Sequence, residues 1–272
     1  MKLLVPTNFS KISEDALSTA VALYHKINNC TITLLHFEKT SANNVFDIDS
    51  EQTQLDPKKL EEYQQYLKNA KESYPSVRMS FVSIAYVSEA DLFNQIEGLK
   101  SDLIVMGTQE VERYENERLV GEHTKKFIKN LQTPIFCLRE KIANANFKKV
   151  VFASNLKESQ IADFNKLNGF LTELQLSIEV VLVVTPDKFI TTEKALRAFE
   201  ASSKTILYPN ITFKIYNEIG VAEGIIGYCQ NNKVDLLIMP THGRKGLDKF
   251  FNGSISEIVL DEIRIPIISI LD

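Results

Sequence analysis

The sequence predicts an α/β protein that contains two tandem copies of one domain, each a doubly wound, mainly parallel sheet of five strands. Three observations lead to this fold class. The chain of 272 residues contains an internal repeat, short β-branched runs alternate with helical patterns in each copy, and the runs are almost continuously apolar. Continuous apolar runs are typical of parallel strands buried on both faces. Alternation of strands and helices favours parallel crossovers and therefore a mainly parallel sheet.

The internal repeat is visible in four pairs of segments, which define the two copies. These pairs are "LLVPTNFS" (3–10) with "VVFASNLK" (150–157), "TITLLHF" (31–37) with "IEVVLVV" (178–184), "DLIVMGT" (102–108) with "DLLIMPT" (235–241), and "TPIFCL" (133–138) with "IPIISI" (265–270). The spacing within the pairs shortens between the second and third pair, so the first copy carries an insertion, which we place at 40–57. We therefore predict domains at 1–143 and 144–272, separated near the polar segment "KIANAN".

Each copy contains five strand patterns in the order expected for this fold. They lie near 2–6, 31–37, 78–85, 102–106 and 134–138 in the first copy, and near 148–153, 177–184, 210–216, 235–239 and 265–270 in the second. Helical spacing of apolar residues predicts helices over 13–27, 62–74, 89–99 and 255–263. Ser10 or Ser13 is expected to cap the first of these helices, and Ser88 the third.

Composition and charge exclude several classes of protein. The net charge of −4 argues against a nucleic-acid partner, which would favour a basic face. Cys30, Cys137 and Cys229 lie far apart without metal-binding spacing, which indicates buried thiols in a reducing compartment. The apolar run before Pro6 is too short for a signal peptide, and no stretch of 18 apolar residues is present to span a membrane. We expect a cytoplasmic protein.

The segment 241–256, "THGRKGLDKFFNGSIS", suggests a phosphate-binding loop. Gly253 and Ser254 immediately precede a helical pattern, and free amides at a helix N-terminus attract anions. Arg244, Lys245 and Lys249 make the loop basic, with only Asp248 opposing. The alternative is an ordinary capped helix after a loop without a ligand. The residues alone leave both interpretations open.

The whole chain resembles a tandem universal stress protein. The resemblance is carried by the twofold pattern, by "LLVPTNFS" and "TLLHF", and by "DLLIMPTHG" followed by nine residues and "GS". It implies an adenine-nucleotide alpha hydrolase-like, Rossmann-like fold in each copy. It also implies a nucleotide-binding signature of Gly-x-x-Gly, nine residues, then Gly and Ser or Thr.

The second copy matches this signature except at Pro240, whereas the first copy departs from it more widely. In the second copy Gly243, Gly253 and Ser254 match. The first copy retains Gly107 and Gly121 but has Glu110 and Glu122 at the other two signature positions. We therefore predict that the first copy does not bind ATP in the family manner, because two carboxylates would lie beside a polyphosphate.

The resemblance further implies an Asp after the first strand of each copy, where this sequence has Asn8 and Asn155. Asn can donate and accept hydrogen bonds but carries no charge. The resemblance implies that the second copy is the site where ATP could bind, together with Mg. The residues expected to bind it are Ala153, Asn155, Val184, Met239, Pro240, Thr241, His242, Gly243, Gly253, Ser254, Ile255 and Ser256.

Three functions from different classes remain open: a nucleotide-binding regulatory protein, an ATP-using enzyme, and a scaffold for a protein partner or other small ligand with decayed nucleotide sites. The enzyme is disfavoured, because neither a Gly-rich "SGGxDS"-like loop nor an "HxGH" motif follows a first strand and no catalytic set can be assigned. We expect a stress-response protein that binds an adenine nucleotide, with at most slow ATP hydrolysis.

Other features have structural interpretations. His36 is interpreted as structural, and "DIDSE" at 47–51 as part of a solvated insertion, because Gln52 and Lys58 do not fit a calcium-binding EF-hand loop. The final strands of the two copies are apolar and would otherwise leave exposed edges, so we expect them to pair as an intramolecular pseudo-dimer. A further homodimer is possible.

Overall fold

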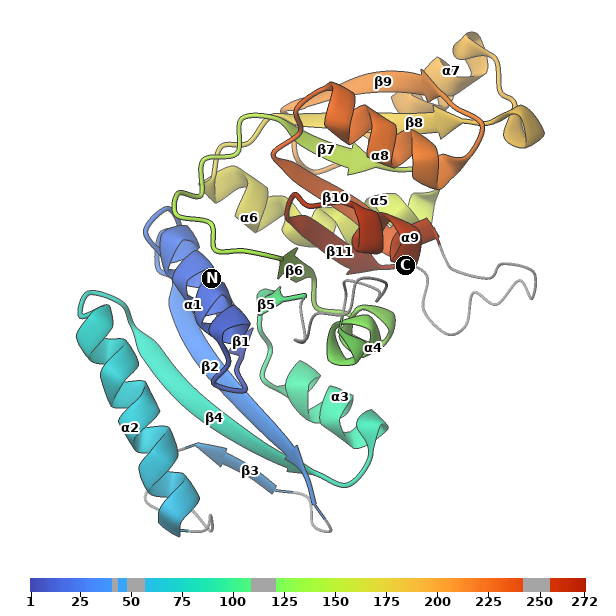
Figure 1. Cartoon of the computed structure of the whole chain (residues 1–272). Coiled ribbons are helices and arrows are strands. Elements are labelled where there is room, and N and C mark those ends of the chain that lie inside the picture. Colours follow the sequence, from blue (N-terminus) through green and yellow to red (C-terminus); the bar gives the residue numbers. More distant parts are fainter. Residues whose placement is uncertain (41–43, 48–56, 109–120, 242–254) are drawn as a thin grey trace. The chain divides into compact units, whose positions relative to one another are not determined.

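The computed structural model describes residues 1–40, 44–47, 57–108, 121–241 and 255–272 (Figure 1). The chain divides into two compact units. Unit 1 comprises residues 1–107 and 140–145, and unit 2 comprises residues 108–139 and 146–272. Residues 108–139, which belong to the first sequence copy, are therefore grouped with the second copy. The boundary between the copies at 143/144 stays a prediction from the sequence repeat.

Unit 1 contains a sheet in the order β3-β4-β2-β1-β5. Its elements are β1 (Lys2–Pro6), α1 (Lys11–Tyr24), β2 (Thr31–Lys39), β3 (Asn44–Asp47), α2 (Pro57–Ser73), β4 (Met79–Tyr86), α3 (Glu89–Gly98) and β5 (Leu103–Gly107). All strand pairs are parallel except β3 with β4. Helix α1 packs on β1, β2 and β5, whereas α2 and α3 pack on β4.

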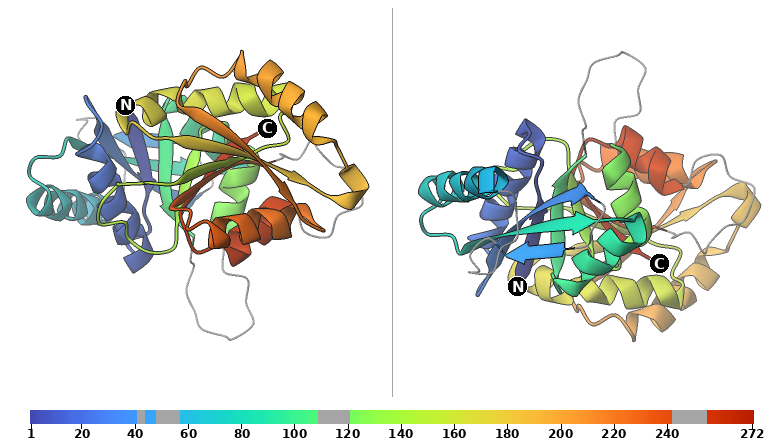
Figure 2. Two further views of the ribbon diagram at one scale, coloured as in Figure 1. Left: turned by 90° about the horizontal axis from the view of Figure 1, so that it is seen from above. Right: turned by 90° about the horizontal axis from the view of Figure 1, so that it is seen from below.

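Unit 2 contains a sheet in the order β6-β11-β10-β7-β8-β9. Its strands are β6 (Ile135–Leu138), β7 (Val150–Ala153), β8 (Ile178–Val184), β9 (Ile211–Asn217), β10 (Leu236–Thr241) and β11 (Ile267–Leu271). Its helices are α4 (Glu122–Asn130), α5 (Glu158–Phe164), η1 (Asn165–Leu167), α6 (Asn168–Glu173), η2 (Pro186–Lys188), α7 (Thr192–Ser203), α8 (Val221–Asn231) and α9 (Ile255–Glu262). Helices α5, α6 and α7 cover one face of this sheet, and α8 and α9 cover the other (Figure 2).

The ten predicted strands are all present, and the core follows from their apolar runs. The central strands β1 and β7 are buried along almost their whole length, as parallel strands covered on both faces must be. Phe152 of β7 stacks on Phe164 of α5 with ring centroids 4.3 Å apart, and both side chains are fully buried. The fold class predicted from the repeat is therefore confirmed.

The insertion in the first copy differs from the prediction. Residues 44–47 form β3, which pairs antiparallel with β4, so part of this segment extends the sheet instead of being a solvated loop. No sequence pattern predicted this strand, because its short run does not alternate and is followed by acidic residues. Residues 48–56 lie outside the described part of the chain.

The predicted pairing of the two final strands is confirmed. Strand β6 pairs antiparallel with β11, with Phe136 opposite Ile268. Arg139, which follows β6, donates hydrogen bonds to the carbonyls of Leu260 and Asp261 at the end of α9. A cation at a helix C-terminus stabilises the last carbonyl groups and the helix dipole. The end of the first sequence copy is thus part of the structure of unit 2.

The helix caps agree in part with the sequence. Ser88 Oγ accepts a hydrogen bond from the Asp91 N–H at 3.2 Å and so caps α3 as predicted. Ser10 occupies the N-cap position of α1, but its hydroxyl makes no capping bond. It donates instead to Asn8 Oδ1, which belongs to the turn that precedes the helix.

Candidate functional site

The candidate site of unit 2 lies where the order of its strands reverses. The chain passes from β7 to β8 on one side and later reaches β10 on the other side of β7. Parallel sheets bind ligands in the crevice outside the carboxyl ends at such a reversal. Ile238 of β10 lies opposite Phe152 of β7, so β10 continues two residues beyond the level at which β7 ends. This register brings Met239 and Pro240 close to the turn after β7.

The turn after β7 has a defined geometry that the sequence predicted only in part. Asn155 is exposed, and its Oδ1 accepts a hydrogen bond from the Lys157 N–H at 3.1 Å. Leu156 has a φ of 63°, a left-handed conformation that is uncommon for a residue other than glycine. Ser154 Oγ stabilises it by accepting from the Leu156 N–H at 3.0 Å.

Gln160 completes this turn from the first helix after β7. Its Oε1 accepts from the Ser154 hydroxyl at 2.9 Å and from the Asn155 N–H at 3.0 Å. The Gln160 side chain is buried, so these bonds satisfy a polar group that would otherwise be costly to bury. Ser154 and Gln160 were missed as site residues. Their signal was the repeat itself, since Thr7 and Ser13 occupy the same places in the first copy.

The other predicted strand-end residues contribute mainly backbone to this edge. Ala153, Val184 and Met239 are buried, whereas Pro240 is half-buried. The Thr241 hydroxyl is directed into the core, where it lies 3.1 Å from Ser269 Oγ and 3.3 Å from the Ile270 carbonyl oxygen. A ligand at this edge would therefore meet Asn155 and strand-end backbone before it met the other predicted side chains.

Helix α9 begins with two of the predicted phosphate-binding residues. Ile255 is exposed and Ser256 half-buried in its first turn. His242, Gly243, Gly253 and Ser254 lie outside the described residues. Glu257, also in the first turn, forms an ion pair with Lys129 of α4. This pairing reduces the negative charge near the start of the helix, where an anion would bind.

The corresponding turn in unit 1 has the same backbone geometry. Asn8 Oδ1 accepts from the Ser10 N–H at 3.2 Å, and Thr7 Oγ1 accepts from the Phe9 N–H at 3.1 Å. Phe9 has a φ of 63°, as Leu156 has in unit 2. The Asn at this position is therefore the centre of an equivalent turn in both copies.

Aromatic side chains surround the turn of unit 1. The Phe9 ring lies 5.1 Å from that of His36, 5.8 Å from that of Tyr63 and 4.8 Å from that of Tyr66. Tyr63 also stacks on Phe81 at 5.3 Å. Burial, together with the charges of Glu38 and Glu62, raises the pKa of Tyr63 to about 12. These five aromatic residues, here called the aromatic cluster, pack beside the end of β1.

His36 has a structural environment, as its sequence context suggested. Its Nδ1 lies 3.0 Å from the Thr7 carbonyl oxygen. A carbonyl oxygen can only accept, so Nδ1 carries the proton in this contact. The ring packs against Phe9 and Tyr63, with centroids 5.1 Å and 5.0 Å away.

Gly107, which matches the nucleotide signature in the first copy, has a packing role. A Cβ atom at this position would lie 2.1 Å from Ile12 Cγ1 of α1. Only glycine therefore allows α1 to approach the end of β5 so closely. Of the two glutamates expected to repel a phosphate in this copy, Glu110 lies outside the described residues and Glu122 begins α4.

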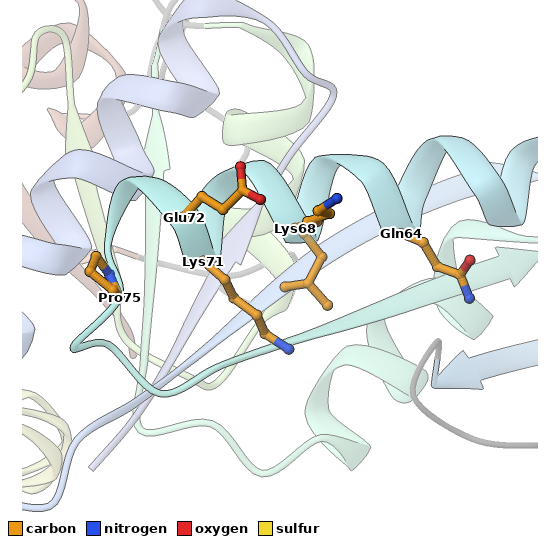
Figure 3. Close-up of a pocket in the computed structure, with 6 residues that line it drawn as sticks. Gln64, Lys68, Lys71, Glu72 and Pro75 are labelled. Atoms are coloured by element: carbon orange, nitrogen blue, oxygen red, sulfur yellow. The ribbon is translucent and has the colours of Figure 1, made fainter.

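A depression elsewhere on the described surface lies away from this edge of the sheet. A depression of about 480 Å³ lies on α2 (Figure 3), lined by Gln64, Leu67, Lys68, Lys71, Glu72 and Pro75. Because Pro75 precedes β4, this depression is on the side of the amino end of that strand, away from the carboxyl edge. Within the described residues, no group of three or more His, Cys, Asp or Glu could hold a metal ion.

Further observations concern membrane insertion and thiol chemistry. No helix in the described ranges is long and apolar enough to cross a membrane. All three cysteines are buried and free, and burial raises the pKa of Cys137 and of Cys229 to about 12. Such thiols have little thiolate character at neutral pH and are poor nucleophiles.

Comparison of the chain with known proteins identifies its family. The model of the universal stress protein family matches residues 1–139 and 191–270. A universal stress protein of Synechocystis sp. is 26% identical over 184 residues, which cover 65% of this chain and 61% of that protein. The matched part therefore spans about three fifths of the length of that relative. The second matched segment includes β10 and α9 but not β7 or β8.

Solved structures support the fold. A universal stress protein from Archaeoglobus fulgidus DSM 4304 superposes with a TM-score of 0.70 at 14% identity, covering 99% of this chain and 98% of that chain. A functionally unknown protein from Pseudomonas aeruginosa PAO1 superposes with a TM-score of 0.62 at 12% identity, and the superposition covers 99% of this chain and 92% of that chain. At such identities the likeness concerns the fold alone. The match of the family model over most of its length establishes that this chain belongs to the universal stress protein family.

Proposed function

We propose that this protein is a cytoplasmic stress-response regulator that binds ATP or a related adenine nucleotide in unit 2 and has no strong catalytic activity. Binding would report the nucleotide state of the cell to a partner. The first sequence copy would not bind nucleotide in the family manner. ATP hydrolysis, if present, would be slow, because no acid–base pair or nucleophile is assembled at the edge of the sheet in the described residues.

The observation that supports this proposal is that the turn centred on Asn155 and the end of β10 lie side by side at the strand reversal of unit 2, and that the signature sequence follows β10 along the chain. The turn centred on Asn155 follows β7, the signature loop with Gly253 and Ser254 follows β10, and that loop leads directly into α9. Free amides and the dipole of a helix N-terminus favour phosphate groups. The backbone amides of Gly253, Ser254, Ile255 and Ser256 would hold the phosphates, assisted by the two serine hydroxyls.

Asn155 and Val184 would contact the ribose and base. Because Asn155 Oδ1 already accepts a hydrogen bond from Lys157, its Nδ2 group is the one that remains to donate to a ligand. Mg²⁺ would bind mainly through the phosphates and water, since it commonly retains several waters beside nucleotide phosphates. Pro240 lacks an N–H group, so we expect weaker binding than a glycine there would allow.

Calorimetric titration with ATP and Mg²⁺ tests the proposal, with one variant in each copy. Gly253→Asp adds bulk and negative charge where the phosphates would bind, and we expect it to abolish detectable binding. Gly121→Asp is the matched control, because Gly121 is the corresponding glycine and the N-cap of α4, a position that Asp readily occupies. We expect the control variant to bind ATP like the wild type.

Two results would contradict the proposal: wild-type protein that does not bind, or equal binding by wild type and Gly253→Asp. In either case a scaffold for a protein partner or another small ligand would become the better interpretation. Asn at the family's Asp position and Pro240 within the signature favour that second candidate. Mass spectrometry of the freshly purified protein under native conditions would identify any small molecule that co-purifies.

A further inference from the structure

Strand β9 forms an open edge of the sheet of unit 2. It pairs in parallel with β8 over its whole length, from Ile211 opposite Ile178 to Asn217 opposite Val184. In the part of the chain that the structure describes, no strand pairs with the other side of β9. Figure 1 shows β9 at the outer margin of this sheet, with α7 beside it. We call this free side of β9 the β9 edge.

The direction of each backbone group on β9 follows from two hydrogen bonds at its ends. The Ile178 N–H donates to the Asn210 carbonyl at 3.0 Å, and the Glu218 N–H donates to the Val184 carbonyl at 3.1 Å. Residues alternate in a parallel ladder, so the even-numbered residues of β9 bond to β8. The N–H and C=O groups of Phe213, Ile215 and Asn217 therefore point outward. These are three consecutive binding positions for an added strand.

The equivalent edge in unit 1 is covered. Strands β4 and β9 are the third strands of their sequence copies, and each pairs with the second strand. In unit 1, β3 pairs antiparallel with the outer side of β4, from Asn44 opposite Ala85 to Asp47 opposite Val82. Strand β3 belongs to the insertion that the second copy lacks. The first copy thus contains a strand of four residues where the second has none.

Several exposed apolar residues lie on segments that adjoin β9 in the chain or pack on it. Six large hydrophobic side chains are exposed in the described residues, and four of them are Leu207 and Ile219, which flank β9, Leu196 of α7, and Phe189, which follows η2. Leu207 lies before β9 and is 65% exposed, and Ile219 follows it and is 79% exposed. Leu207 and Ile219 thus offer one apolar side chain near each end of β9 to a segment that pairs along the strand.

Lys214 gives this edge a charge preference. It is exposed at the middle of β9, and it forms no ion pair among the residues described. Lysine on an edge strand discourages pairing with an identical strand. An antiparallel pair of β9 strands overlapping over all seven residues would place Lys214 directly opposite its copy, which is unfavourable. An acidic residue at that position would be favourable.

We propose that the β9 edge binds an extended segment of a partner protein, which adds as an antiparallel strand and carries apolar residues together with an acidic residue opposite Lys214. The main chain of the segment would bond to Phe213, Ile215 and Asn217. Its apolar side chains would contact the exposed residues around β9. Strand addition of this kind takes affinity from backbone hydrogen bonds and specificity from alternate side chains. The proposed binding of a segment to the β9 edge does not depend on nucleotide binding.

A synthetic peptide with the sequence of residues 42–49, "ANNVFDID", is the probe, because it contains the segment that forms β3 in unit 1. The peptide is titrated into ¹⁵N-labelled full-length protein and followed by NMR and amide hydrogen exchange. We expect shift changes concentrated on β9 and slower exchange of the amides of Phe213, Ile215 and Asn217. The matched control peptide has both aspartates replaced by lysine, and should bind about fivefold more weakly or worse.

Two variants separate charge from backbone pairing. Lys214→Glu should reverse the preference between the two peptides. Ile215→Pro removes one outward N–H while leaving the ladder to β8 intact, as an edge strand tolerates, and should abolish binding of both peptides. Circular dichroism and thermal unfolding confirm that each variant remains folded.

Three results would overturn the proposal. They are the absence of shift changes on β9, changes centred on β4 instead, and peptide binding that Ile215→Pro leaves unaltered. Sedimentation over a range of protein concentrations tests self-association. A dimer that Ile215→Pro dissociates would show that the β9 edge binds a second copy of the chain, and would also contradict the proposal.

Discussion

The turns after β1 and β7 have the same backbone but different surroundings. In each, an Asn side chain accepts the N–H two residues on, and the next residue has a φ of 63°. Around the first turn, Phe9 packs into the aromatic cluster with His36 and Tyr63. Around the second, Leu156 is buried and Asn155 is exposed. The comparison teaches that one local backbone geometry can carry an aromatic side chain that stacks on its neighbours in one copy and a buried leucine in the other, while the Asn side chain stays exposed in both.

The largest expected effect comes from removing the centre of the aromatic cluster. Tyr63 is 3% exposed and contacts Phe9, His36 and Phe81. Tyr63→Ala should lower the free energy of unfolding of unit 1 by about 3–5 kcal/mol, the range for removal of a large buried aromatic side chain. Urea unfolding measures this change, and ATP titration of the folded variant should give unaltered affinity.

Lys68→Ala is the matched control on the same helix, because Lys68 is exposed. It should change stability by less than about 0.5 kcal/mol. A marked loss of ATP affinity in folded Tyr63→Ala would show that the aromatic cluster contributes to nucleotide binding, and the contrast between the two turns would fail.

An intermediate effect is expected from substitutions at the first glycine position of the signature, which is Gly107 in the first copy and Pro240 in the second. Gly107→Ala would force a Cβ atom against Ile12 and should cost about 1–3 kcal/mol of stability, as overpacking does, without changing ATP affinity. Pro240→Gly should instead raise ATP affinity about tenfold or more. It restores an N–H group, and a hydrogen bond to a charged group is worth about 1.5–3 kcal/mol.

Thermal or urea unfolding and calorimetry with ATP measure both variants. The two copies would be functionally alike at this position if Gly107→Ala weakened nucleotide binding. Pro240→Gly binding no more tightly than wild type would show that this position does not contact the phosphates.

A further expected effect is confined to high pH, where it changes stability and leaves the protein at neutral pH unaltered. Burial and nearby glutamates raise the pKa of Tyr63 to about 12 from an unperturbed 10.0. The folded protein therefore holds this proton when the unfolded chain has released it. The resulting stability is fully present below about pH 10 and is lost as the pH rises from about 10 to about 12.

Tyr63→Phe retains the ring but has no group to titrate. Between pH 10 and 12 its free energy of unfolding should fall less steeply than that of the wild type, by up to about 1.4 kcal/mol per pH unit. Urea unfolding at several pH values compares the two slopes. If the free energies of unfolding of the two proteins fell equally steeply with pH, the pKa of Tyr63 would not be raised in the folded protein. The aromatic cluster would then be more hydrated than its burial indicates.

The sequence alone predicted the tandem α/β fold, because the evidence is spread along the chain. All ten strands of the two copies could be located from apolar runs such as "LLIM" and "VVLVV", and the repeat identified equivalent positions. The asparagines at 8 and 155 were found in the same way. Periodicity and repetition are local signals, and parallel strands buried on both faces leave the strongest of them.

Tertiary structure decided the features that depend on residues distant in sequence. Strand β3 acquires its conformation by pairing with β4, Phe9 meets Tyr63 through the path of α2, and Gly107 is required by the approach of Ile12. Likewise, β9 is an open edge because, among the strands that the structure describes, none pairs with its outer side. Such properties arise from packing between elements, whose free energy depends on which surfaces meet, and no single segment contains that information.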